Sequence, residues 1–114
     1  MIDENCLFCK IVAGKIPAEI VKRKDRVTIF KDISPQAPIH YLIIPNDHFA
    51  NMAEVAKSEP SLVGEIFAAA DEVANELGMD AYRSNINTGE AAGQSVFHAH
   101  LHLLAGRAFA WPPG

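Results

Sequence analysis

The feature that most constrains the fold is a strict two-residue alternation near the C-terminus, in the segment 98–104. Three of the five histidines of the chain, His98, His100 and His102, occupy every second position there, and the residues between them are apolar. Successive side chains of a β-strand point to opposite faces, so the three imidazoles are expected on one face and the apolar residues on the other. The pattern predicts a half-buried strand that carries a row of histidines.

Such a row indicates chemistry, because imidazole acts as nucleophile, proton carrier and metal ligand near neutral pH. Purification tags also cluster histidines, but tags are contiguous, terminal and not interleaved with leucine. A structural zinc face is a stronger alternative, since alternate histidines of a strand can reach one metal ion. The row by itself leaves the catalytic and the zinc interpretations open.

Length and composition limit the class of protein. A chain of 114 residues predicts a single domain spanning 1–114. Its apolar content of 49% and charged content of 21% are typical of a globular protein. No apolar run approaches the ~20 residues that span a bilayer, and the first residues have no signal-peptide pattern, so we expect a cytoplasmic, soluble protein with no membrane partner. The net charge of -4 argues against a nucleic-acid polymer as partner.

The two cysteines of the chain, Cys6 and Cys9, form a single CxxC motif. In an intracellular protein this motif indicates a redox pair or half of a four-ligand zinc site. The redox pair normally follows a strand, and no strand precedes this motif, which favours half of a metal site. Two small buried side chains are a third interpretation.

The remaining patterns predict one short helix at 4–13, a helical turn at 51–56 and one long helix at about 58–78. Ser58 is the expected N-cap of the long helix, with Pro60 in its first turn and Gly78 at its end. Strands are expected at 18–22, 26–31, 40–44, 83–87 and 98–104. Short strands joined by short turns favour an antiparallel sheet with helices segregated to one side, an α+β domain.

Two loops could bind a ligand. The segment 32–38 holds two prolines and begins with Asp32, which suits either a ligand-binding loop or a plain connector. The segment 88–95 is rich in small residues and could present main-chain N–H groups to an anion, although it matches no phosphate-binding fingerprint. Taken alone, His40 would be a core histidine and His48 a surface residue.

The segment 98–104 matches the histidine-triad (HIT) pattern, in which three histidines alternate with apolar residues. The segments 32–38, 93–97 and 111–114, together with His40, resemble the Hint branch of this family, the histidine triad nucleotide-binding proteins. The resemblance covers most of the chain. It implies a five-stranded antiparallel sheet with one long and one short helix, and a homodimer whose sheets join. It also implies hydrolysis of the P–N bond of purine nucleoside phosphoramidates, derivatives of AMP or GMP.

The resemblance assigns a role to each matching residue. His100 is the nucleophile that forms a nucleotidyl-histidine, His102 holds phosphate oxygens, and Ser95 assists the leaving amine. His40 and His98 support the nucleophile. The implied substrate contacts are Asp32 with the ribose, Phe30, Ile33 and Leu42 with the base, Asn87 and Gly93 with sugar and phosphate, and Trp111 in the C-terminal tail. No cofactor is implied for catalysis, because imidazoles and N–H groups can stabilise the developing charge.

The CxxC motif is similar to that of bacterial HIT proteins and of galactose-1-phosphate uridylyltransferases, in which it joins two histidines on a structural zinc ion. The matching residues here are Cys6, Cys9, His48 and His98, a chemically suitable zinc set. Two other functions stay open. One is dinucleoside polyphosphate hydrolysis, as in the Fhit branch, against which the segments 95–97 and 111–114 argue. The other is a non-catalytic purine-nucleotide sensor or scaffold.

Overall fold

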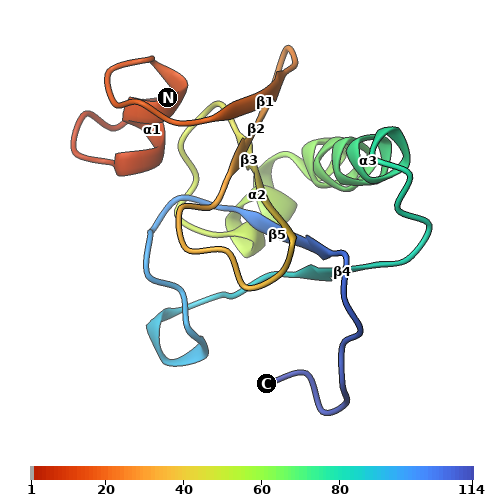
Figure 1. The fold of residues 1–114 in the computed structure, drawn as a ribbon. Helices are drawn as coiled ribbons and strands as arrows, with labels where there is room; N and C mark the ends of the chain where they lie inside the picture. The colour runs from red at the N-terminus through yellow and green to blue at the C-terminus, as the bar shows by residue number, and fades with distance from the viewer. Residues whose placement is uncertain (1) are drawn as a thin grey trace.

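The computed structural model describes residues 2–114, so Met1, the first residue of the predicted domain, lies outside the described residues. Five strands form one antiparallel sheet in the order β1-β2-β3-β5-β4 (Figure 1). This confirms the predicted five-stranded α+β fold. In chain order the elements are α1 (Leu7–Val12), β1 (Ile20–Arg23), β2 (Val27–Lys31), β3 (Ile39–Pro45), α2 (Met52–Ser58), α3 (Pro60–Glu76), β4 (Tyr82–Asn85), the 3-10 turn η1 (Glu90–Ala92) and β5 (Leu101–Ala105).

The central strand β3 divides its side chains between two cores, as the alternation predicts. Tyr41 and Ile43 belong to the main core, which α2 and α3 cover, and Leu42 and Ile44 belong to a second cluster with Phe8 of α1. Figure 1 shows α1 and α3 at opposite sides of the sheet. The prediction that all helices lie on one side is therefore wrong, because the apolar face of α1 packs on the face that also carries the histidines. No helix in the described part of the chain is long and apolar enough to span a membrane.

The region before the long helix also differs from the prediction. Residues 52–58 form a complete helix rather than a turn, because the Asn51 side chain accepts a hydrogen bond from Glu54 N at 3.0 Å and caps its first turn. Ser58 is consequently the last residue of α2, and its hydroxyl donates to the Glu54 carbonyl rather than capping the long helix. That helix, α3, begins at Pro60 and is followed by Gly78, as expected. Residues 2–114 thus contain two short α-helices and one long α-helix.

The strand β5 begins at Leu101, three residues later than predicted. His98 and His100 precede it because the main chain there pairs outside the sheet, with Ala99 N donating to Phe49 O at 2.7 Å. The predicted division of faces nevertheless holds. Ala99, Leu101 and Leu103 are at most 1% exposed in the main core, and the histidines lie on the opposite side.

Candidate active site

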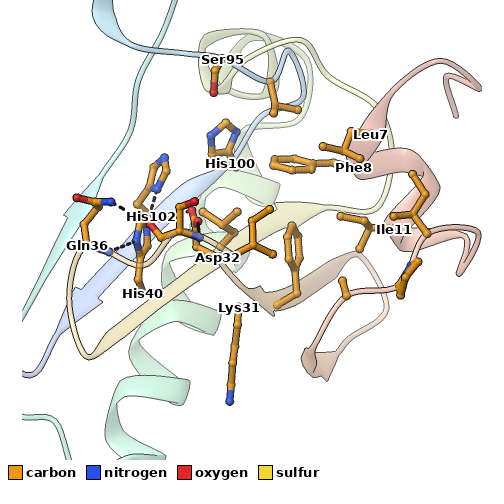
Figure 2. A pocket seen from close by; sticks show the side chains of 18 residues that line it. Leu7, Phe8, Ile11, Lys31, Asp32, Gln36, His40, Ser95, His100 and His102 are labelled. Atoms are coloured by element: carbon orange, nitrogen blue, oxygen red, sulfur yellow. Dashed lines mark hydrogen bonds and ion pairs between the residues drawn. The ribbon is translucent and has the colours of Figure 1, made fainter.

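A cavity of about 520 Å³ opens on the face of the sheet that carries α1, between that helix and the loop after β2 (Figure 2). Leu7, Phe8 and Ile11 give it an apolar end, and the imidazoles lie at the other end. The structure brings most of the predicted site residues to this cavity. Those that line it are Phe30, Asp32, Ile33, His40, Leu42, Ser95, His100 and His102.

The His100 ring is held in one protonation state. Its Nδ1 lies 2.7 Å from the carbonyl oxygen of His98, and since a carbonyl only accepts, Nδ1 carries the proton. Burial lowers the pKa of His100, so the ring is neutral at pH 7. Nε2 therefore bears a lone pair and has no hydrogen-bond partner within residues 2–114. A buried neutral imidazole with a free lone pair beside a cavity is a candidate nucleophile.

A series of two hydrogen bonds, from Gln36 to His40 and from His40 to His102, orients the His102 ring. Gln36 N–H donates to His40 Nδ1 at 3.0 Å, so the proton of the neutral His40 ring is on Nε2. That Nε2–H donates to His102 Nδ1 at 2.9 Å, which places the proton of His102 on its Nε2 (Figure 2). Burial lowers the pKa of both rings, that of His102 to about 4. His102 therefore offers an N–H donor to a ligand of the cavity.

Asp32, His40 and His102 lie close enough together to hold a metal ion, with Asp32 Oδ2 3.4 Å from His40 Nε2. A metal would need the lone pairs of both His40 Nε2 and His102 Nδ1. His40 would then carry its proton on Nδ1, directly against the Gln36 N–H. Because two N–H donors would then face each other, the hydrogen bonds from Gln36 to His40 and from His40 to His102 are favoured over a metal site.

A separate group of possible metal ligands, the cysteine cluster, consists of Cys6, Cys9, His48 and His98, whose ligand atoms all lie within 4.8 Å of one another. The Cys6 Sγ to His98 Nδ1 distance is 3.3 Å, and Cys9 Sγ is 3.5 Å from Nδ1 of both His48 and His98. The usual zinc bond lengths imply ligand separations of about 3.6 Å in a tetrahedral site. His98 Nε2–H donates to Pro45 O at 2.8 Å, which leaves the Nδ1 lone pair toward the thiols. The donor set therefore fits a Cys₂His₂ zinc site.

His98 and Phe8 connect this cluster to the cavity. The His98 ring belongs to the cluster, whereas its carbonyl oxygen orients His100. Phe8, between the two cysteines, packs edge-on against His98 and His100 with ring centroids at 5.9 and 5.2 Å. The N-terminal helix α1 therefore packs directly against the candidate nucleophile through Phe8.

Three predicted substrate contacts do not line the cavity. Asn87 and Gly93 lie beside each other, with Asn87 Nδ2 3.5 Å from Gly93 O. Trp111 is 83% exposed. The tail before it is held by Arg83 of β4, whose guanidinium lies 5.1 Å from the Phe109 ring centroid and donates to the Ala110 carbonyl at 3.0 Å. The His98 ring also points away from the cavity, into the cysteine cluster.

Sequence reasoning missed several residues of the cavity wall. Leu7, Phe8 and Ile11 were expected only as part of a short helix, and nothing in their spacing shows which surface that helix covers. Gln36 acts through its main-chain N–H, which leaves no signature in the side chain. Behind the cavity wall, the buried Gln94 was also missed, because its loop was expected to act through its glycines.

Comparison with known proteins identifies the family. The protein-family model described as "Scavenger mRNA decapping enzyme C-term binding" matches residues 5–109. An uncharacterized HIT-like protein of Synechococcus elongatus is 43% identical over 114 residues, which cover 99% of this chain and 100% of that protein. The chain belongs to the histidine-triad (HIT) family.

This HIT protein is also similar to two solved structures. A HIT family hydrolase from Legionella pneumophila has a TM-score of 0.92 and 45% identity and covers 96% of this chain and 100% of its own. A histidine triad nucleotide-binding protein from Candida albicans has a TM-score of 0.82 and 30% identity and covers 95% and 83%.

Proposed function

We propose that this HIT protein is a hydrolase of the Hint type that cleaves the P–N bond of purine nucleoside phosphoramidates. The observation that carries the proposal is the state of His100. Its Nδ1–H is held by a carbonyl, and its Nε2 lone pair is free beside a cavity of about 520 Å³. The names of the similar structures, a hydrolase and a nucleotide-binding protein, support the same class.

In the first step, His100 Nε2 attacks the α-phosphorus, a P–N bond to the imidazole forms and the P–N bond to the amine breaks. The attack leaves a positive charge on the imidazole, which the His98 carbonyl stabilises through the Nδ1–H. The His102 Nε2–H donates to a phosphate oxygen as negative charge grows there. The amine leaves with a proton that the Ser95 hydroxyl delivers.

In the second step, water attacks the phosphorus of the nucleotidyl-histidine. A P–O bond forms, the bond to His100 Nε2 breaks, and the attacking water gives a proton to Ser95, which restores its hydroxyl. The nucleoside monophosphate leaves, and the neutral imidazole with its proton on Nδ1 is restored. Dividing the displacement between two steps lets one nucleophile serve both halves of the reaction. In this scheme His40 is a positioning residue, since it touches His102 and not the phosphate.

The two ends of the cavity suit the two parts of a nucleotide. Phe30 and Leu42 form an apolar wall for a purine base, next to Phe8 of α1. Ile33 is 97% exposed at the mouth, where it can close over the base. The Asp32 carboxylate lies between the apolar end and the imidazoles, where it can accept hydrogen bonds from ribose hydroxyls.

We also propose that Cys6, Cys9, His48 and His98 bind a structural zinc ion. When bound, the ion would cross-link α1 to the segment that carries the triad, and no step of the reaction passes through it. Metal analysis of untagged protein tests this proposal. About one zinc ion per chain is expected, and a value near zero under non-chelating conditions contradicts it.

The homodimer with joined sheets is a further part of this proposal. The outer side of β4 is a free sheet edge in the described chain, and strand pairing there can extend the sheet. Light scattering tests it, with a dimer mass as the expected result and a monomer mass at micromolar concentration as the contrary one.

The decisive experiment is incubation with adenosine 5'-phosphoramidate. AMP release and a transient AMP adduct on His100 are expected, and His100→Ala should bind AMP but release none from the phosphoramidate. Full activity of His100→Ala would overturn the mechanism. Faster turnover of a diadenosine polyphosphate would instead favour the Fhit-type reaction, and AMP binding without any turnover would favour a sensor.

A further inference from the structure

The side-chain amide of Gln94 is buried, and its oxygen and both of its N–H groups are hydrogen-bonded. The residue is 2% exposed. Its Oε1 accepts from Gly89 N–H at 2.8 Å, and its Nε2 donates to the carbonyls of Ala50 at 2.7 Å and Val96 at 3.1 Å. These partners determine the orientation of the amide, because an N–H only donates and a carbonyl only accepts. An apolar side chain would fill the same space without needing three partners, so the hydrogen bonds themselves call for an explanation.

These bonds restrain the main chain on both sides of Ser95. Gln94 N–H also donates to the Gly89 carbonyl at 3.1 Å, so Gln94 and Gly89 are joined twice and close the loop around η1. The bond to the Val96 carbonyl spans Ser95 itself. The bond to Ala50 ties the loop to the segment that follows β3.

Ser95 has no comparable restraint of its own. Its side chain lines the cavity, and its hydroxyl has no hydrogen-bond partner in the part of the chain that the structure describes. Figure 2 shows Ser95 next to His100 at the same end of the cavity. The main chain sets the position of the Ser95 Cβ and thereby the region beside His100 that the hydroxyl can occupy.

We infer that Gln94 is a positioning residue that holds the Ser95 hydroxyl beside His100 for proton delivery to the leaving amine. The inference rests on the proposed function. Gln94 touches neither the nucleophile nor the cavity, so it acts only through Ser95.

The test compares Gln94→Met, which keeps the length of the side chain but has no amide, with Gln94→Asn, which keeps the amide on a side chain shorter by one methylene group. Hydrolysis of adenosine 5'-phosphoramidate is the readout. Because small displacements of a reacting group are costly, we expect Gln94→Met to lower kcat by about tenfold or more, with KM changed by less than about threefold. The kcat of Gln94→Asn should lie between those of Gln94→Met and the unchanged protein.

A double-mutant cycle with Ser95→Ala separates positioning from a general structural effect. If Gln94 acts through Ser95, Gln94→Met causes little further loss in the Ser95→Ala background. If the kcat of the double variant falls by the product of the two single-variant factors, the inference is overturned. Should Gln94→Met fail to bind AMP in calorimetry, the same cycle with Gln94→Asn decides.

Asn46→Ala is the matched control. The Asn46 amide also makes three hydrogen bonds, accepting from Thr28 Oγ1 and donating to the carbonyls of Lys24 and Asp25, but it does not line the cavity. We expect it to lower the unfolding midpoint and leave kcat unchanged, and an equal loss of kcat would overturn the inference. Absence of hydrolysis by the unchanged protein overturns the proposed function and this inference together, whereas multiplying effects in an active enzyme overturn the inference alone.

Discussion

Protonation of His102 links acidic pH to the stability of the fold, and we predict that His102→Gln removes this link. Burial, with repulsion from His100 and His40 adding to it, lowers the pKa of His102 to about 4 in the folded protein. The unfolded chain has the ordinary value of about 6.5. As the pH falls, the unfolded state takes up the proton first. The contribution of His102 to folding is therefore complete above about pH 6.5 and is lost progressively toward pH 4.

The magnitude follows from the two pKa values. Their difference is about 2.5 pH units, from about 6.5 and about 4, which corresponds to roughly 3 kcal/mol when the loss is complete. At pH 5 the loss is about 2 kcal/mol relative to pH 7. His102→Gln is suited to the comparison, because the glutamine Oε1 can accept the hydrogen bond that His40 Nε2–H donates. The substitution removes the titration and keeps an acceptor.

Urea unfolding at pH 7 and pH 5 measures the effect. The unchanged protein should lose about 2 kcal/mol more between these pH values than His102→Gln. Tyr82→Phe is the control, since it loses the bond to Asp71 Oδ1 at 2.7 Å but no imidazole, and its pH dependence should equal that of the unchanged protein. Equal losses in His102→Gln and the unchanged protein would refute the reasoning.

Four further substitutions test other parts of the structure. Cys9→Ser removes a ligand of the proposed zinc site, so metal analysis should show loss of zinc and calorimetry a lower Tm; unchanged zinc content would contradict the site. Gly106→Ala should lower the free energy of unfolding by more than about 1 kcal/mol, because φ is +95° and a Cβ there would lie 2.9 Å from Pro38. Gly64→Ala on α3, where nothing lies within 4 Å, should instead stabilise by about 0.5–1 kcal/mol, and equal shifts of Tm would refute this. Phe8→Ala should cost roughly 3–5 kcal/mol and weaken AMP binding, and an unchanged Kd would separate Phe8 from the cavity.

The alternation in 98–104 illustrates what is predictable from local pattern. A period of two assigns side chains to faces without knowledge of the partner strand, so the buried positions of Leu101 and Leu103 followed from it. The starting residue of β5 did not follow, because it depends on where Ala99 N finds an acceptor. The position of α1 on the histidine face was likewise beyond the pattern.

The candidate site divides in the same way. Residue types and spacing singled out His98, His100 and His102 and indicated half of a metal site at the CxxC motif. The family resemblance assigned roles to Asp32 and Ser95 and added two histidines to the cysteines. The opposite directions of the His98 ring and carbonyl, and the proton positions on His40, His100 and His102, required the folded chain.

The sequence by itself determined which side chains can do chemistry and which face of the strand carries them, because both depend on residue type and on neighbours along the chain. The tertiary structure decided which nitrogen of His40, His98, His100 and His102 carries the proton, since that choice begins from main-chain groups of Gln36, Pro45 and His98. It also decided that the Gln94 amide donates to the Val96 carbonyl across Ser95. Buried polar groups must find partners wherever the fold provides them, and the distant partners cannot be read from the local sequence.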